Sequence, residues 1–223
     1  MTFVAPGLDM RLPISLLLLS ALLQPGAILA AEASPAMKRI DAQVAAQPDW
    51  LADARACPVS LLPERQSYIE VSSGDCKTGL AQCLAECKFG DARSCYWLAY
   101  GVQQGGGQEQ TSEALFQRAC RLGVVSGCTN RAAGMLTATP GAPAIQHCAA
   151  RTFEKGCALD DPWACTMYAL HLSRGMGVKA DPALALRVLE KSCKYGADDP
   201  ACRNAAALRK QIELARTKGA AVK

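Results

Sequence analysis

The sequence predicts an all-α fold, a solenoid of antiparallel helix pairs in which a disulfide closes each pair. Cysteines occur in four similar pairs, and the first cysteine of each pair lies at position 87, 120, 157 or 193. The steps between these positions are 33, 37 and 36 residues, a period typical of stacked helical hairpins. Around the cysteines, apolar residues recur at intervals of three and four residues, which indicates helices.

Each repeat is expected to contain two helices, with the turn between them lying between the paired cysteines. Segments with helical spacing that lead into a first cysteine, or begin the partner helix, are 95–102, 112–122, 145–159, 165–175 and 182–195. Turn signals stand between the paired cysteines at Gly90-Asp91, Gly123, Asp160 to Pro162 and Gly196 to Pro200. A terminal helix is predicted near 203–217.

The spacing within each cysteine pair requires the chain to reverse. Residues eight apart on one helix are separated by about 12 Å along its axis, whereas a disulfide tolerates roughly 4.4 to 6.8 Å between α-carbons. Structural zinc sites usually have cysteines two to four residues apart, so no metal site is expected. The predicted disulfides are Cys87–Cys95, Cys120–Cys128, Cys157–Cys165 and Cys193–Cys202.

Small and bulky residues keep a fixed register with the cysteines. Four residues after each second cysteine there is an alanine: Ala99, Ala132, Ala169 and Ala206. Four residues before each first cysteine there is Cys83, Phe116, Phe153 or Leu189. A bulky side chain opposite a small one lets two helices approach closely, so we expect each alanine to face the other helix of its own hairpin.

Four cysteines remain outside these pairs. Cys57 is expected to pair with Cys76 or Cys83, because each repeat of a solenoid contacts only its neighbours. Cys148 then has no obvious partner. Two alternatives are compatible with the sequence, a labile free thiol and a buried, inert one.

Residues 1–33 are predicted to be a cleaved signal peptide. Arg11 precedes an apolar run at 13–23, and small residues follow, so that cleavage after Ala33 or Ala30 is expected. The run is too short to span a membrane as a helix. The mature chain is therefore predicted to be periplasmic or secreted, where cysteines pair. Residues 34–75 form an extension of unassigned structure, and 218–223 form a tail.

Charge gives little information about partners. Residues 34–223 contain 23 basic and 18 acidic side chains without a basic run, so neither nucleic acid nor a membrane surface is indicated as a partner.

Residues 168–193 resemble the Sel1-like repeat. That pattern has a Gly-x-Gly-Val loop, an acidic residue, and then Ala and Leu in the second helix, and here these places are occupied by Gly175, Gly177, Val178, Asp181, Ala185 and Leu189. With its cysteine pairs, the chain is similar to the Helicobacter cysteine-rich protein group of that family over about residues 76–215, and the repeat domain is expected to span residues 76–217. The segment 137–143 lacks the Gly-x-Gly loop, so a different bend is expected there.

The resemblance implies a right-handed α-solenoid that mediates protein–protein contacts. It also implies two alternatives, a weak β-lactam-binding or β-lactam-hydrolysing protein, with a β-lactam or peptidoglycan-like ligand, and a thiol- or haem-handling assembly factor.

The residues themselves predict no catalytic centre. A conventional serine β-lactamase needs Ser-x-x-Lys, which is absent from the sequence. His147 and His171 have no partner at zinc-binding spacing and are interpreted as exposed helical histidines. No metal or cofactor is expected.

A partner-binding groove is predicted on the second helix of each pair. Positions two, six and nine residues after each second cysteine share a helical face opposite the alanine, and they vary from repeat to repeat. The predicted groove residues are Trp97, Gln104, Asn130, Met167, His171, Arg174, Asn204 and Gln211. The remaining residues at these positions of the four repeats are Gly101, Gly134, Thr137 and Leu208.

Overall fold

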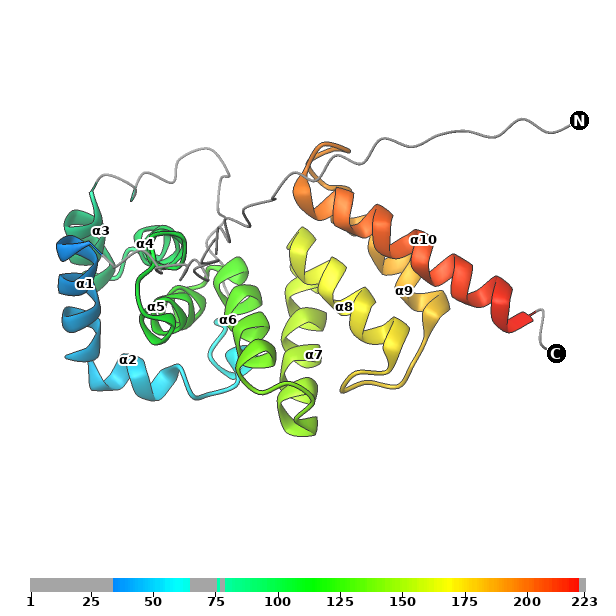
Figure 1. Cartoon of the computed structure of the whole chain (residues 1–223), viewed down its shortest axis with the longest axis horizontal. Helices are drawn as coiled ribbons and strands as arrows, with labels where there is room; N and C mark the ends of the chain where they lie inside the picture. Colours follow the sequence, from blue (N-terminus) through cyan, green and yellow to red (C-terminus); the bar gives the residue numbers. More distant parts are fainter. Residues whose placement is uncertain (1–33, 65–75, 77–78, 221–223) are drawn as a thin grey trace, which may run out of the picture. The chain divides into compact units, whose positions relative to one another are not determined.

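The computed structural model describes residues 34–64, 76 and 79–220, without the side chains of 218–220. Within these ranges the chain is helical and contains no strand. Consecutive helices pack against each other along the chain, so the predicted all-α, solenoid-like fold is confirmed (Figure 1).

Four helical hairpins make up the repeats. The first is α3 (Leu80–Lys88) with α4 (Ala92–Gln104), and the second is α5 (Glu109–Arg121) with α6 (Val125–Ala138). The third is α7 (Pro143–Ala158) with α8 (Pro162–Arg174). In the fourth, α9 (Pro182–Val188) continues as the 3-10 helix η2 (Leu189–Cys193) and is followed by α10 (Pro200–Ala220).

Side-chain caps and proline fix where several of these helices begin. Asp91, Asp161 and Asp181 accept hydrogen bonds from backbone N–H groups in the first turns of α4, α8 and α9. Proline occupies the first helical position of α7, α8 and α9, where its missing N–H costs nothing. These local signals place the turns where the sequence predicts them.

The four predicted disulfides are present, and each closes a hairpin. Their α-carbons are 4.7 Å apart in Cys87–Cys95, 4.6 Å in Cys120–Cys128, 4.5 Å in Cys157–Cys165 and 4.4 Å in Cys193–Cys202. The two thiols of each pair therefore meet across the turn between antiparallel helices.

The prediction for the remaining cysteines is wrong. Cys57 pairs with Cys148 across 91 residues, and Cys76 pairs with Cys83. The reason is that residues 34–64, which we call the strap, lie against several repeats instead of forming one more unit of the array. All twelve cysteines are paired. Six disulfides fit an oxidising compartment.

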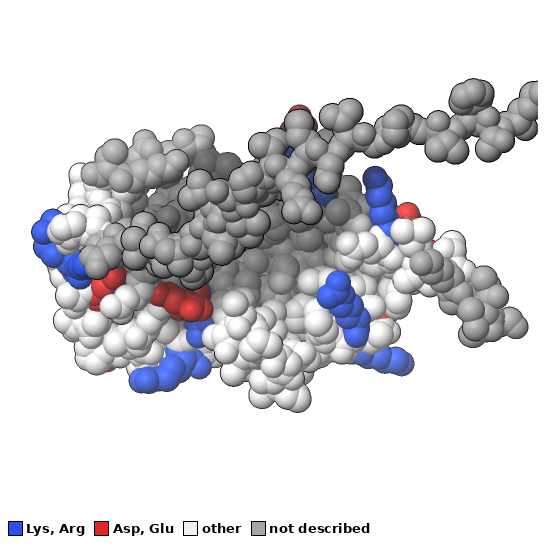
Figure 2. All heavy atoms as spheres, in the orientation of Figure 1, with Lys and Arg blue, Asp and Glu red and all other residues white. Residues whose placement is uncertain are grey.

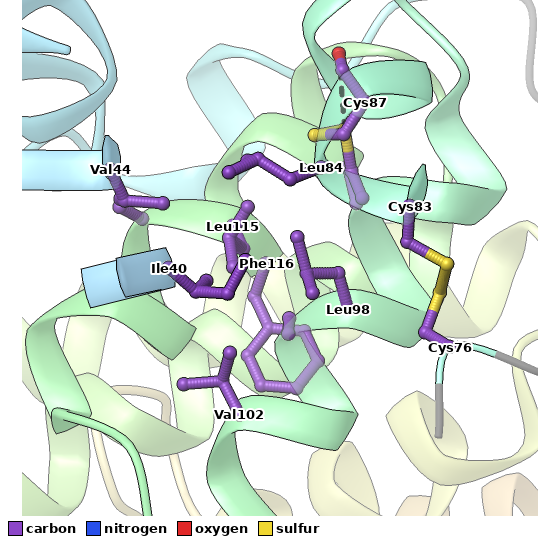
Figure 3. Packing of buried hydrophobic residues seen from close by; sticks show 14 of the residues in the cluster. Ile40, Val44, Cys76, Cys83, Leu84, Cys87, Leu98, Val102, Leu115 and Phe116 are labelled. Atoms are coloured by element: carbon purple, nitrogen blue, oxygen red, sulfur yellow. Dashed lines mark hydrogen bonds between the residues drawn. A yellow bond between two sulfur atoms is a disulfide. The ribbon is translucent and has the colours of Figure 1, made fainter. Parts of the chain in front are cut away.

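The strap contains α1 (Pro35–Ala45), α2 (Pro48–Asp53) and the 3-10 helix η1 (Pro58–Ser60). Ile40 and Val44 of α1 belong to the same buried cluster as Leu84, Leu98 and Leu115 of the first repeats (Figure 3). Residues 34–64 of the extension that the sequence leaves unassigned therefore contribute to the hydrophobic core.

Polar contacts attach the strap further along the repeats. The carboxylate of Asp53 pairs with Arg121 at 2.5 Å, at the end of α5. The Ala54 carbonyl accepts hydrogen bonds from Nη2 and Nε of Arg131 on α6, at 2.6 and 3.0 Å. With the bridge to Cys148 on α7, these contacts connect the strap to three successive helices.

Three of the four register alanines are buried, but the prediction that each faces the other helix of its own hairpin is wrong for Ala132 and Ala169, which pack with the next repeat. Ala99, Ala132 and Ala169 have no exposed surface, and they share buried clusters with Phe116, Phe153 and Leu189 of the following helix. Ala206 is exposed instead, and its neighbour Ala205 is buried. The last hairpin has one extra residue between its cysteines, and no helix among the described residues follows α10 to cover Ala206.

The signal peptide predicted at 1–33 lies outside the described residues. Among the helices of the described ranges, none combines the length and the apolar character that a membrane crossing needs.

Candidate functional site

The structure brings part of the predicted groove together. Trp97, Asn130 and Met167 occupy equivalent positions on α4, α6 and α8, and each is partly exposed. Asn130 donates from Nδ2 to the Tyr96 hydroxyl at 3.3 Å, which links α6 to α4 beside Trp97. The other exposed members are Gln104, Arg174, Asn204 and Gln211.

His171 does not belong to an accessible surface, so its prediction as a groove residue and as an exposed histidine is wrong. Its side chain is fully buried, with its ring edge-on to Phe153 at 5.2 Å between centroids. Its Nδ1 lies 2.7 Å from the Met176 carbonyl, which can only accept, so Nδ1 carries the proton. Burial lowers the pKa of the imidazole. His147 is exposed, with Nδ1 3.2 Å from the Gly177 carbonyl.

Two other groove positions also face the interior. Leu208 is buried with the cluster of the last repeat. Gly134 lies against the Glu113 carboxylate, which occupies the space that a side chain at 134 would need. The sixth position after the second cysteine therefore points inward in α6, α8 and α10, where a neighbouring helix covers it.

The first hairpin carries a polar hollow of about 330 Å³. Its described lining consists of Cys76, Gly79, Gln82, Cys83, Glu86, Asp91, Arg93, Ser94 and Trp97. Glu86 accepts hydrogen bonds from the Ser94 hydroxyl at 2.6 Å and from Nε2 of Gln82 at 2.9 Å. The bond from Ser94, followed by that from Gln82, lowers the pKa of Glu86.

The hairpin disulfide explains why Glu86 and Ser94 meet. They directly precede the bridged Cys87 and Cys95, so the short α-carbon distance of that bridge brings them side by side. The equivalent pairs in the next two repeats are the small residues Ala119 with Gly127 and Gly156 with Ala164.

The Gly156–Ala164 pair is covered by the preceding repeat. A β-carbon on Gly156 would come within 3.5 Å of Val125 and Thr129 of α6. In the described ranges no repeat precedes the first hairpin at this position, and the polar pair Glu86 and Ser94 lines the hollow. The sequence analysis did not predict Glu86 and Ser94 as site residues. The signal that could have identified them is that each directly precedes a cysteine of the same predicted disulfide.

A second hollow, of about 490 Å³, lies between α1 and α4. It is lined by Ser34, Met37, Leu80, Tyr100, Gly101, Gln104 and Gly105, and Gln104 and Gly101 are predicted groove positions. Trp97, which lines the polar hollow, and Tyr100, which lines this one, pack edge-on with ring centroids 6.0 Å apart. Tyr100 is 40% exposed. Two adjoining aromatic rings therefore connect the two hollows.

The electrostatic surface is mixed. On the face shown in Figure 2, basic and acidic side chains occur in separate small groups. The part of the chain with described coordinates holds no group of three or more His, Cys, Asp or Glu side chains placed to bind a metal ion. Together, the hollows and the aromatic pair are suited to holding a ligand surface by apolar contact and hydrogen bonds.

Comparisons with protein-family models, curated proteins and solved structures find no match to this chain.

Proposed function

We propose that the protein is an exported Sel1-like repeat scaffold that binds another protein through the first hairpin and the adjoining row Trp97, Asn130 and Met167. The observation that carries this proposal is the pair of hollows on α4, one polar and one of mixed lining that includes Met37 and Leu80, connected by Trp97 and Tyr100. Rigid aromatic side chains beside polar groups are typical of binding hot spots.

The residues that carry the Sel1-like resemblance have matching structural roles, which supports that part of the proposal. Gly175 and Gly177 have φ values of 71° and 67°, a conformation that favours glycine. Asp181 caps α9, while Ala185 and Leu189 are buried. A repeat frame of this kind presents variable side chains on a constant scaffold.

Site-specific photo-cross-linking in the producing cell tests the proposal. A photoreactive amino acid placed at Trp97, Tyr100 or Asn130 is expected to give a discrete cross-linked species with one partner protein. The same amino acid at Lys155, exposed on α7, serves as the control position. Identical products from all positions, or none from the groove positions, would contradict the proposed function.

One arrangement favours the β-lactam alternative as a second candidate. The Ser94 hydroxyl lies 2.6 Å from the Glu86 carboxylate in the wall of the polar hollow. Because the pKa of Glu86 is lowered, this carboxylate is a weak base, and we expect slow hydrolysis at most. Ser94→Ala should abolish turnover of a chromogenic cephalosporin, whereas Ser173→Ala should not. Turnover that persists in Ser94→Ala excludes this serine.

Pairing of all twelve cysteines leaves no free thiol to support the thiol-handling alternative, and no observation on the described residues favours haem binding.

A further inference from the structure

Among the described residues, nothing covers the outer face of α10 in the way that the equivalent face is covered in the first three repeats. In the first three repeats the alanine four residues after the second cysteine is fully buried, and a bulky side chain of the following helix lies in its cluster. In α10 the equivalent Ala206, together with Ala207, is exposed. The helix packs on α8, α9 and η2 through Ala201, Ala205, Leu208 and Ile212.

This helix also continues beyond the body that supports it. It has 21 residues, while the second helices of the first three repeats have 13, 14 and 13. Every side chain from Glu213 to Thr217 is exposed, including Leu214 at 60%. A helical segment such as 213–217, of which every side chain is exposed, gains little stability from packing within the chain.

The net charge of the chain from residue 34 onward is concentrated here. Residues 34–202 contain 17 basic and 17 acidic side chains, whereas 203–223 contain six basic and one acidic. Its single carboxylate, Glu213, lies 4.0 Å from Arg209 on the same helix. Exposed Arg203 and Lys210, seven residues apart and so on the same side of the helix, therefore make the outer face of α10 basic.

We propose that this outer face, centred on Ala206, Lys210 and Leu214, docks an acidic amphipathic helix of a partner protein. The repeats themselves show the packing that the face accepts, a bulky side chain over the alanine. Acidic side chains flanking that bulky residue would complement Arg203 and Lys210, which steers association and sets orientation. The proposal rests on the proposed scaffold function and adds the chemistry of one partner.

Charge and geometry favour such a helix over other occupants. A second copy of the chain that docked through its own α10 would bring like charges together. Its first repeat is not free to dock there instead, because α1 covers that repeat through Ile40 and Val44. A lipid surface would need a strongly apolar face, but the large apolar side chains Leu208 and Ile212 of α10 are buried against the repeats, and Leu214 is the one large apolar side chain exposed on its described part.

Fluorescence anisotropy with designed helical peptides tests the docking face on the oxidised, exported protein. The panel consists of acidic amphipathic peptides with Phe, Leu or Ile at the central position, and matched peptides in which Lys replaces Glu. We expect the acidic peptides to bind and the basic ones not to. Ala206→Leu, which removes the space without changing charge, and Lys210→Glu should each weaken binding at least tenfold. Lys155→Glu on α7 should leave it unchanged.

Several outcomes would overturn the proposal. These are no binding by any acidic peptide, binding that Ala206→Leu leaves intact, preferential binding to phosphatidylglycerol vesicles, or a dimer in sedimentation that Ala206→Leu dissociates. Circular dichroism of each variant checks that α10 still folds. If the peptides do not bind while cross-links at Trp97 persist, the α10 assignment is wrong and the scaffold function stands. If peptide binding and cross-links are both absent, both proposals are wrong.

Discussion

Cys57 and Cys148 are joined by a disulfide whose α-carbons are 5.7 Å apart, although 91 residues separate them in the sequence. This bridge fastens the strap to α7, and Thr152, one turn further along α7, lies 3.9 Å from the Cys57 sulfur. Repeats in a solenoid ordinarily interact only with their neighbours. The bridge therefore couples the N-terminal strap to the third repeat directly.

Removal of this bridge should cost more stability than removal of any hairpin disulfide. On the chain-entropy account, opening a loop of this length lowers the free energy of unfolding by about 4 to 5 kcal/mol, against about 2.5 kcal/mol for a nine-residue loop. Urea denaturation of Cys57→Ser/Cys148→Ser measures the first, and Cys193→Ser/Cys202→Ser is the matched control. Equal losses in the two variants would show that the strap does not brace the repeats.

Glu113 should make the protein more stable at mildly acidic pH. Burial raises the pKa of its carboxyl to about 7, against the opposing effect of Arg131, whose Nη1 lies 2.6 Å away. The folded state then holds a proton that the unfolded state releases above its ordinary pKa near 4.5. The bound proton therefore stabilises the folded state by on the order of 3 kcal/mol. This stabilisation is fully present below the ordinary pKa and is lost as pH rises toward 7.

Denaturant unfolding between pH 4.5 and 8 measures that slope in the wild type and in Glu113→Gln. The free energy of unfolding of Glu113→Gln should fall much less across this pH interval than that of the wild type. A slope that is the same in both proteins would assign the pH dependence to other groups, such as buried Asp161.

Gln117 is a site where a less polar residue should stabilise the fold. Its side chain is fully buried on α5, and neither amide atom has a hydrogen-bond partner within the described part of the chain. An unsatisfied buried amide costs about 1 to 3 kcal/mol. Gln117→Met should therefore raise the free energy of unfolding by roughly that amount, while Gln110→Met, exposed on the same helix, should change little. A destabilised Gln117→Met protein would contradict the assignment.

Asp161 connects two repeats as well as capping a helix. Its Oδ1 accepts the Ala164 N–H at 2.9 Å, and its Oδ2 accepts the Ser126 hydroxyl of α6 at 2.7 Å. Asp161→Ala should cost about 2 to 4 kcal/mol, because it removes a cap and leaves buried donors unpaired. Asp91→Ala removes an exposed cap and should cost about 1 kcal/mol. Thermal unfolding compares the stabilities of the two variants. Equal losses of stability would show that Asp161 only caps its helix and does not connect the repeats.

The sequence predicts the helical hairpins because the local rules agree. Cysteine spacing, apolar periodicity, and the Asp and Pro starts of α4, α8 and α9 all point to the same turns. The pairing of Cys57 with Cys148 could not be predicted, since it depends on where the strap lies. That position is fixed by contacts such as Asp53 with Arg121, which no periodicity encodes.

The candidate site was predicted only in part for a related reason. Helical spacing identified Trp97 and Gln104, which line the two hollows. It placed His171 on the same face, because a single-helix count ignores the neighbouring loop that supplies the Met176 carbonyl. Glu86 and Ser94 come from different helices, so only the disulfide geometry brings them together.

Peptide mapping of the non-reduced protein by mass spectrometry tests the account most directly, because the strap, the polar hollow and the repeat frame all depend on the disulfide pattern. We predict Cys57–Cys148 and Cys76–Cys83 beside the four hairpin bridges, with no cysteine open to alkylation. A link from Cys57 to Cys76 or Cys83, or an alkylated Cys148, would contradict the account.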